Sequence, residues 1–311
     1  MFEVLLPLAG TPADDVATAH ARRVAALLGA RVHLVRVLES RRTSDRPTDP
    51  VDWQMKKGEA EASLARAAEQ LGAANVESSQ VLLEGDPTEH LMNYARQSSA
   101  DLVLLTGGPR RGTLGMSGGE LLWRCYLTTL LLRPDNLDEP EGEQGAYGRI
   151  LVALDGSKRA ECVLPWVQLL AEQGSGKDVE VVLTHVVLEP ELPRLTPAND
   201  EDRELVRRLV ERNREEASEY LEGARARLGV RAETRLLQGP KVATALHDLV
   251  EAEGIDVVVL SAHGYGGESR WPFGDVATSF IDYGRTPLLL VQDMPKGQPA
   301  PVAVTTESWG G

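Results

Sequence analysis

The chain has 311 residues and a net charge of −14, which argues against binding the backbone of DNA or RNA, because such binding needs basic patches. The hydrophobic fraction is 42%, enough for ordinary globular cores, and no apolar run approaches the roughly 18 to 20 residues of a membrane span. With only Cys125 and Cys162 and no basic signal-peptide segment at the N-terminus, we expect a cytoplasmic protein.

Apolar runs alternate with helical patterns along the first half of the chain. In chain order, the pattern predicts a strand within 4–11, a helix at 12–30, a strand within 32–39, a helix at 62–73, a strand and a helix within 81–95, and strands within 100–108 and 128–133. The runs are continuous rather than alternating, which is typical of strands buried on both faces of a parallel sheet.

The second half repeats the first in the same order. "VLLPLAGT" (4–11) resembles "ILVALDGS" (150–157), and "VHLVRVLE" (32–39) resembles "VLTHVVLE" (182–189). Three further matches follow at nearly constant offset: 81–95 with 235–250, 100–108 with 255–263, and 128–133 with 286–291. Helical patterns at 159–174 and 204–229 complete the second copy. We therefore predict two tandem doubly wound α/β domains, each a five-stranded parallel sheet with helices on both faces.

The expected domains are 1–133 and 149–293, joined by an acidic, proline- and glycine-containing linker at 134–148. Residues 294–311 are expected to form a disordered tail.

Two polar, proline-containing segments, 40–52 and 190–202, are predicted to be long surface loops covering one edge of each sheet. The last strands, 128–133 and 286–291, would each leave an apolar edge exposed, so we expect them to pack together as an intramolecular pseudo-dimer. A further homodimer of two such chains is left open.

Asp155 is a candidate binding residue because it directly follows the first strand of the second copy. Ligands of open α/β sheets bind at the carboxyl ends of the strands, where a carboxylate can accept hydrogen bonds from ribose hydroxyls. The alternative is that Asp155 only caps the next helix.

The loop from Ser261 to Gly274 is the second candidate. Gly264 and Gly274 are expected to supply positive φ and close backbone approach, and the following helix start favours an anion. Arg270 could offset phosphate charge, and His263 could contact a ligand. The alternative is an ordinary flexible glycine loop.

The order "ILVALDGS", "THVV", "LLQGP", "DVVVLSAHG", then nine residues to "GD", then "TPLLLV" resembles the universal stress protein family, here as two copies in tandem. This family has an adenine-nucleotide alpha-hydrolase-like fold and a motif of G-x-x-G, nine residues, then G-[S/T]. The resemblance implies contacts to adenine and ribose from Ala153, Leu154, Asp155 and Val186. It implies contacts to phosphate from Gly264, Gly274, Asp275 and Val276.

The sequence departs from that motif at two positions of the second copy. Ser261 replaces the first glycine, which is a mild change because serine is small. Asp275 replaces the hydroxyl residue that contacts phosphate, and as a good helix N-cap it would satisfy the same N–H donors. Two like charges about 4 Å apart repel by roughly 1 kcal/mol in water and about 4 kcal/mol at an effective dielectric near 20. We therefore expect binding that is weak or dependent on Mg²⁺.

The first copy departs further. Ala9 stands at the position of Asp155, Pro109 fixes φ where a glycine is needed, and Glu120 again puts a carboxylate at the phosphate position. We expect no ATP in this copy.

No P-loop, no G-x-S-x-G motif and no metal-ligand spacing is present, so we predict neither catalytic nor metal-binding residues. The resemblance implies a stress-response protein that binds ATP or AMP in the second copy without substantial catalysis. The alternative is a ligand-free scaffold or protein-interaction module of the same fold. An enzyme of the wider fold group is the third and weakest reading, because no acid/base pair or nucleophile constellation can be located.

Overall fold

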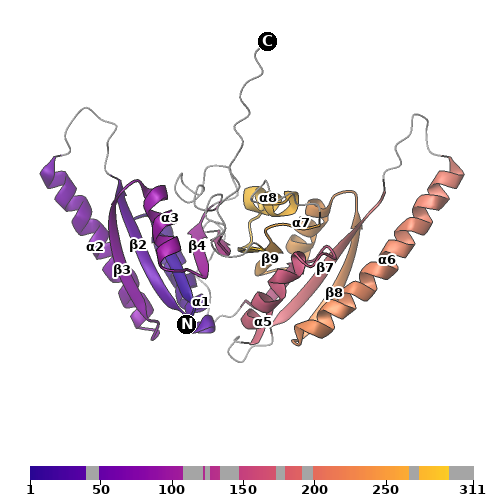
Figure 1. Cartoon of the computed structure of the whole chain (residues 1–311), viewed down its shortest axis with the longest axis horizontal. Helices are drawn as coiled ribbons and strands as arrows, with labels where there is room; N and C mark the ends of the chain where they lie inside the picture. The colour runs from indigo at the N-terminus through magenta and orange to yellow at the C-terminus, as the bar shows by residue number, and fades with distance from the viewer. Residues whose placement is uncertain are drawn as a thin grey trace, which may run out of the picture.

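The computed structural model describes residues 1–39, 49–107, 122, 127–133, 147–172, 179–190, 199–265 and 273–293. These residues contain one ten-stranded sheet in the order β3-β2-β1-β4-β5-β10-β9-β6-β7-β8 (Figure 1). The strands are β1 (Glu3–Leu8), β2 (Arg31–Glu39), β3 (Ser78–Gly85), β4 (Leu102–Thr106), β5 (Thr129–Leu132), β6 (Arg149–Ala153), β7 (Glu180–Leu188), β8 (Ala232–Gly239), β9 (Val257–Ser261) and β10 (Leu288–Val291).

Each half of the sheet has the same strand order, and all pairs within a half are parallel. The halves meet where β5 pairs antiparallel with β10, with Leu131 opposite Leu288 and Leu130 opposite Leu289. All residues of both strands are buried. The predicted fold and the predicted pairing of the two last strands are therefore confirmed.

Helices cover both faces of the sheet. They are α1 (Ala13–Leu28), α2 (Pro50–Gly72), α3 (Pro87–Gln97), α5 (Leu164–Glu172, after a 3₁₀ turn at Ala160–Val163), α6 (Asp200–Leu228), α7 (Val242–Glu253) and α8 (Asp275–Tyr283). One hydrophobic core lies beneath α1, α2, α5 and α6, and a second lies beneath α3, α7 and α8. Because α1 also packs against α5, the first core runs through both halves. None of the described helices is long and apolar enough to cross a membrane.

The two longest helices begin earlier than predicted. Asp49 accepts a hydrogen bond from the Val51 backbone N–H (2.8 Å), and Pro50 occupies the first turn of α2. Asn199 and Asp202 form a reciprocal capping box that starts α6. Residues 50–52 and 200–202 are therefore helical, and the prediction of loops there is wrong, because these caps satisfy the N–H groups of the first turn.

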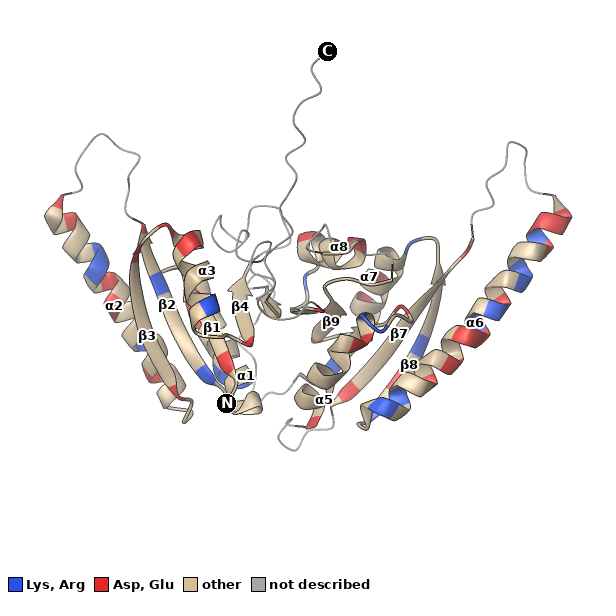
Figure 2. Ribbon diagram, in the orientation of Figure 1, with Lys and Arg blue, Asp and Glu red and all other residues tan. Residues whose placement is uncertain are grey.

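Along the exposed side of α6, acidic and basic residues are interspersed (Figure 2), with ion pairs such as Arg208–Glu204 and Arg212–Glu216. This pattern supports a solvated helix through pairs at i,i+4. Residues 40–48 and 191–198 of the two predicted loops, the linker over 134–146 and the tail 294–311 lie outside the described residues.

Candidate functional site

Asp155 and the glycine loop lie at the carboxyl ends of adjacent strands. Asp155 follows β6, the loop follows β9, and the two strands pair in parallel. The chain leaves β6 toward β7 on one side and returns through β9 on the other, so this is the point where the strand order reverses. Open α/β sheets bind ligands in the crevice at such a switch point.

The carboxylate of Asp155 is hydrogen-bonded both to the segment after β6 and to the loop after β9. Its Oδ1 accepts from the backbone N–H of Ser157 (2.9 Å) and from the Ser157 hydroxyl (2.6 Å), while its Oδ2 accepts from the backbone N–H of Tyr265. The residue itself is exposed. An ionised carboxylate has about four acceptor sites, so one more donor can still be accommodated.

Gly264 is required by space rather than by backbone conformation. Its φ is not in the left-handed region, so the expectation of positive φ is wrong. A Cβ on Gly264 would lie 2.2 Å from Oδ2 of Asp155. The glycine therefore allows the loop backbone to lie directly against the carboxylate.

At Gly274, neither the backbone conformation nor the space around the residue requires a glycine. Its φ is −74°, and a Cβ would meet nothing closer than the Ala262 carbonyl oxygen at 3.8 Å. The expectation that Gly274 supplies positive φ is therefore also wrong.

Among the residues that the structure describes, no side chain caps the start of α8. Gly274 is the N-cap residue and makes no side-chain cap hydrogen bond, while Asp275 is the first helical residue and is exposed. The prediction that the Asp275 carboxylate caps the helix is therefore wrong, because it lies one position too late to do so. Backbone N–H groups of this first turn can serve an anion, and the nearby carboxylate charge would oppose it.

The apolar residues assigned to adenine lie near the carboxyl ends of β6 and β7, with Leu154 in the core beneath α5 and α6 and Val186 in the core beneath α7 and α8. Leu154 and Val186 are 3% and 8% exposed, and Ala153 is partly buried. Both Val186 and Val276 pack with the core beneath α7 and α8. Near them, the carbonyl oxygen of Leu154 accepts from Nδ1 of His185 (2.8 Å). Arg270 lies outside the described residues.

The side chain of His263 connects the loop to Asp293, which follows the last strand, β10. The imidazole of His263 is 1% exposed, and its Nδ1 lies 2.7 Å from Oδ1 of Asp293. The other carboxylate oxygen of Asp293 accepts from Nε of Arg159 (2.5 Å). Burial opposes ionisation of Asp293, but the bonds from His263 and Arg159 outweigh it and hold the carboxyl pKa below its usual value. The imidazole is therefore directed beneath the loop, into a network that fixes it.

Asp293 and Arg159 were not identified from the sequence. A signal was present, because Asp293 follows the last predicted strand of the second copy much as Asp155 follows the first. Ser261, which replaces the first glycine of the family motif, has a structural role. Its hydroxyl donates to the carbonyl oxygen of His263 (2.5 Å) and closes the turn after β9.

At the equivalent place in the first repeat, side chains of the protein itself contact the backbone that follows β1. The carboxylate of Asp14 accepts from the backbone N–H groups of Ala9 (3.0 Å) and Gly10 (2.7 Å). The guanidinium of Arg36 lies against Gly10, where a Cβ would meet Nη2 at 2.1 Å. Pro109 and Glu120 lie outside the described residues.

The sheet register corrects the alignment of the two copies by one residue. Val4 pairs with Val32, whereas the equivalent Ile150 pairs with Val181. Arg36 therefore corresponds to His185 and not to Val186.

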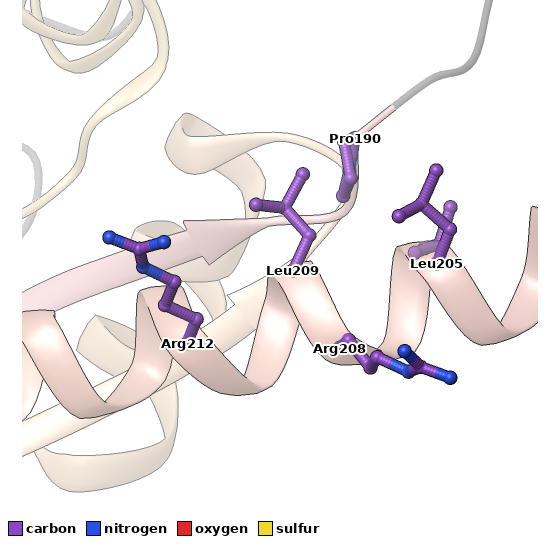
Figure 3. Close-up of a pocket in the computed structure, with 6 residues that line it drawn as sticks. Pro190, Leu205, Arg208, Leu209 and Arg212 are labelled. Atoms are coloured by element: carbon purple, nitrogen blue, oxygen red, sulfur yellow. The ribbon is translucent and has the colours of Figure 1, made fainter.

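Two cavities lie away from the predicted nucleotide residues. One of about 380 Å³ lies between the start of α1, the end of β2 and α2, and Arg36 and Arg66 are on its wall. The other, of about 280 Å³, is an apolar hollow where Leu205 and Leu209 of α6 lie near Pro190 (Figure 3). These leucines are 57% and 41% exposed, and they offer no donors for a phosphate.

The chain matches known proteins in sequence pattern and in fold. The model of the universal stress protein family matches residues 1–126 and 146–292. A universal stress protein from Archaeoglobus fulgidus DSM 4304 superposes with a TM-score of 0.63 at 14% identity, covering 93% of this chain and 96% of that one. A protein of unknown function from Pseudomonas aeruginosa PAO1 superposes with a TM-score of 0.65 at 14% identity, covering 93% and 92%. At this identity the two structures share the fold. No curated protein matches the sequence.

Proposed function

Because the chain belongs to the universal stress protein family, we propose that its second repeat binds an adenine nucleotide, either ATP or AMP. The observation that carries this proposal is the position of the Asp155 carboxylate against Gly264, at the switch point of the sheet and beside the start of α8, where the N-cap residue is a glycine. A hydroxyl-binding carboxylate and an anion-binding helix start in one crevice match the two polar ends of a nucleotide.

In this arrangement a ribose hydroxyl donates a hydrogen bond to the remaining acceptor site of the Asp155 carboxylate. Adenine lies at the carboxyl ends of β6 and β7, beside the segment that carries Ala153, Leu154 and Val186. The phosphates lie over Gly264, Gly274 and the N–H groups of Asp275 and Val276, with Arg270 as a further cation. His263 takes part through the loop position rather than by contact, since its imidazole is buried.

The charge of Asp275 sets the preference among nucleotides. It repels each added phosphate charge, so binding is weak for ATP alone and stronger for AMP or for ATP with Mg²⁺.

No residue of the site is assigned a catalytic role in nucleotide hydrolysis. We place the protein in the cytoplasm, with repeats at 1–133 and 149–293, and with the β5–β10 junction as an internal pseudo-dimer.

The second candidate is a scaffold of the same fold without a ligand. It is favoured by the three hydrogen bonds that Asp155 already accepts within the protein. Native mass spectrometry of the gently purified full chain, followed by calorimetric titration with ATP, AMP and adenosine, distinguishes the two. Adenine nucleotide that co-purifies, or saturable binding abolished by Asp155→Ala, supports the first. Absence of both supports the scaffold.

A further inference from the structure

A serine, a histidine and a glutamate are hydrogen-bonded in series on the first repeat. Oγ of Ser79 lies 2.9 Å from Nδ1 of His33, and Nε2 of His33 lies 2.8 Å from Oε2 of Glu3. The hydroxyl of Tyr94, on α3, is also 2.9 Å from Nδ1. All four residues are partly exposed, and the side chains of His33 and Glu3 are 13% and 24% accessible. The cluster is therefore within reach of a solute.

Strand register brings the three residues together. His33 is the pairing partner of both Ser79 on β3 and Leu5 on β1. Glu3 precedes Leu5 by two residues and so points to the same face of the sheet. Leu5 belongs to the core beneath α3, which is the helix that carries Tyr94. Ser78, one residue before Ser79, points to the opposite face.

The contacts fix the tautomer of the histidine. A carboxylate only accepts hydrogen bonds, so Nε2 of His33 must carry the proton that faces Glu3. In the neutral imidazole Nδ1 then keeps its lone pair and accepts from the Ser79 hydroxyl. A serine hydroxyl bonded to an imidazole nitrogen, with a carboxylate orienting the other nitrogen, is the arrangement that activates a nucleophile.

The second repeat shows that the fold does not require this cluster. By the sheet register, Arg149, Val182 and Glu233 stand at the positions of Glu3, His33 and Ser79. There, Arg149 and Glu233 form an ion pair of 3.0 Å. This place in the sheet thus holds an ion pair in the second repeat, whereas in the first repeat it holds the imidazole of His33 and the hydroxyl of Ser79.

We propose that Ser79 is an acyl-accepting nucleophile, with His33 as its general base and Glu3 as a positioning residue, and that this site hydrolyses small activated esters. Oγ of Ser79 attacks the ester carbonyl carbon while its proton passes to Nδ1 of His33. The carbon–oxygen bond to the leaving group breaks, and His33 returns the proton to that group. Water then attacks the acyl-serine in the same way and releases the acid.

Tyr94 supplies the donor for the oxyanion. Nδ1 has one lone pair, which the hydroxyls of Ser79 and Tyr94 share in the resting state. Once Nδ1 is protonated it no longer accepts from Tyr94, and the phenolic O–H is released to donate to the oxyanion.

The test uses the full chain with two reagents, 4-nitrophenyl acetate and a fluorophosphonate. The fluorophosphonate forms an oxygen–phosphorus bond to serine and releases fluoride with the serine proton. We expect one adduct per chain, mapped to Ser79 by peptide mass spectrometry. Ser79→Ala removes it, His33→Gln slows it by roughly a hundredfold, as expected for loss of a general base, and Ser78→Ala leaves it unchanged.

Separate readouts address the supporting residues and folding. Glu3→Gln is expected to slow both labelling and nitrophenol release, with part of the rate restored in Glu3→Asp. The unfolding midpoint of each variant in urea reports whether it is folded. If the folded wild-type chain gives no adduct at Ser79, or if His33→Gln is labelled there as fast as wild type, the proposal is overturned. Nucleotide binding in the second repeat is unaffected by either result.

Discussion

A guanidinium nitrogen of Arg133 donates to the backbone carbonyl oxygen of Phe280 over 2.8 Å, although the two residues belong to different repeats. The same nitrogen donates to the carbonyl of Ile281 (2.9 Å), and the other terminal nitrogen donates to Gly107 (3.1 Å). Arg133 is 1% exposed, and burial lowers its pKa to about 10, so it stays charged at neutral pH. The first repeat thus supplies a cation to the last turn of α8, where the helix dipole favours positive charge.

Replacing Arg133 with methionine should therefore destabilise the whole chain. We expect a loss of about 2 to 4 kcal/mol in the free energy of unfolding, because buried hydrogen bonds to a charged group are removed from three carbonyls. Urea unfolding followed by circular dichroism measures it. The matched control is Arg212→Met, whose side chain is 76% exposed and which should change stability by less than about 0.5 kcal/mol. Equal effects of the two changes would contradict the role of Arg133.

Losing the Asp155 carboxylate should weaken nucleotide binding. Asp155→Ala removes the acceptor for the ribose hydroxyl and is expected to cost about 1 to 3 kcal/mol in the binding of ATP, AMP and adenosine alike. Calorimetric titration gives the three affinities. Asp200→Ala, with a side chain 98% exposed on α6, serves as the control and should leave them unchanged. A loss confined to ATP would show that Asp155 acts on the phosphates instead.

Removing the charge of Asp275 should have the opposite effect. Asp275→Ser is expected to strengthen ATP binding by about 1 to 4 kcal/mol, from the repulsion that it relieves, and to leave adenosine affinity nearly unchanged. Mg²⁺ should reduce the difference between variant and wild type. If wild type binds Mg²⁺-free ATP as tightly as the variant does, Asp275 does not lie at the phosphates.

The two glycines of the loop form a matched pair for testing the crevice. In Gly264→Ala the new methyl group must displace the Asp155 side chain, which it would approach to 2.2 Å, whereas in Gly274→Ala it makes only ordinary contact. Because the displaced atom ends a flexible side chain, we expect little loss of stability but markedly weaker nucleotide binding in Gly264→Ala alone. Titration of both variants decides it. Equal affinities would mean that the carboxylate position is not important.

Stability should depend on His20 at acid pH. The residue is 2% exposed and stacks on Tyr147, and burial, followed by the charge of Arg23, lowers its pKa from 6.5 to about 4. As pH falls, the unfolded chain takes up the proton first, so stability declines from about pH 6.5 and levels off below about pH 4. The shift corresponds to at most about 3 kcal/mol. Urea unfolding of wild type and His20→Leu at pH 7 and about pH 4.5 should show a smaller decline in the variant. A decline of the same size would place the acid sensitivity elsewhere.

The fold could be predicted because its signals are local or repeated. Continuous apolar runs indicate buried parallel strands, and an exposed apolar edge such as 128–133 indicates pairing with its counterpart. The starts of α2 and α6 were missed even though Asp49 and Asn199 are ordinary cap residues, because the prolines nearby suggested loops. The one-residue shift between β2 and β7 could not be seen, since similar apolar runs align equally well in either register.

The candidate site was predictable only in part. The positions of Asp155 and the glycine loop follow from strand ends, but the need for a glycine at 264 comes from a contact with Asp155, more than a hundred residues earlier in the chain. The same limit applies to Ser79, His33 and Glu3. They are separated by 46 and 30 residues, and the sheet register that joins them leaves no local pattern.

The antiparallel junction of β5 with β10 within one chain also affects how the sequences of the two repeats can diverge in evolution. In a symmetric dimer joined through such an edge, one gene encodes both halves, and any substitution alters both crevices at once. Here each half has its own codons, so Asp155 can persist while Ala9 stands at the matching place, and Arg133 can reach across the junction while Gln292 occupies its counterpart. A single chain thus permits a division of labour that an identical pair of subunits cannot encode.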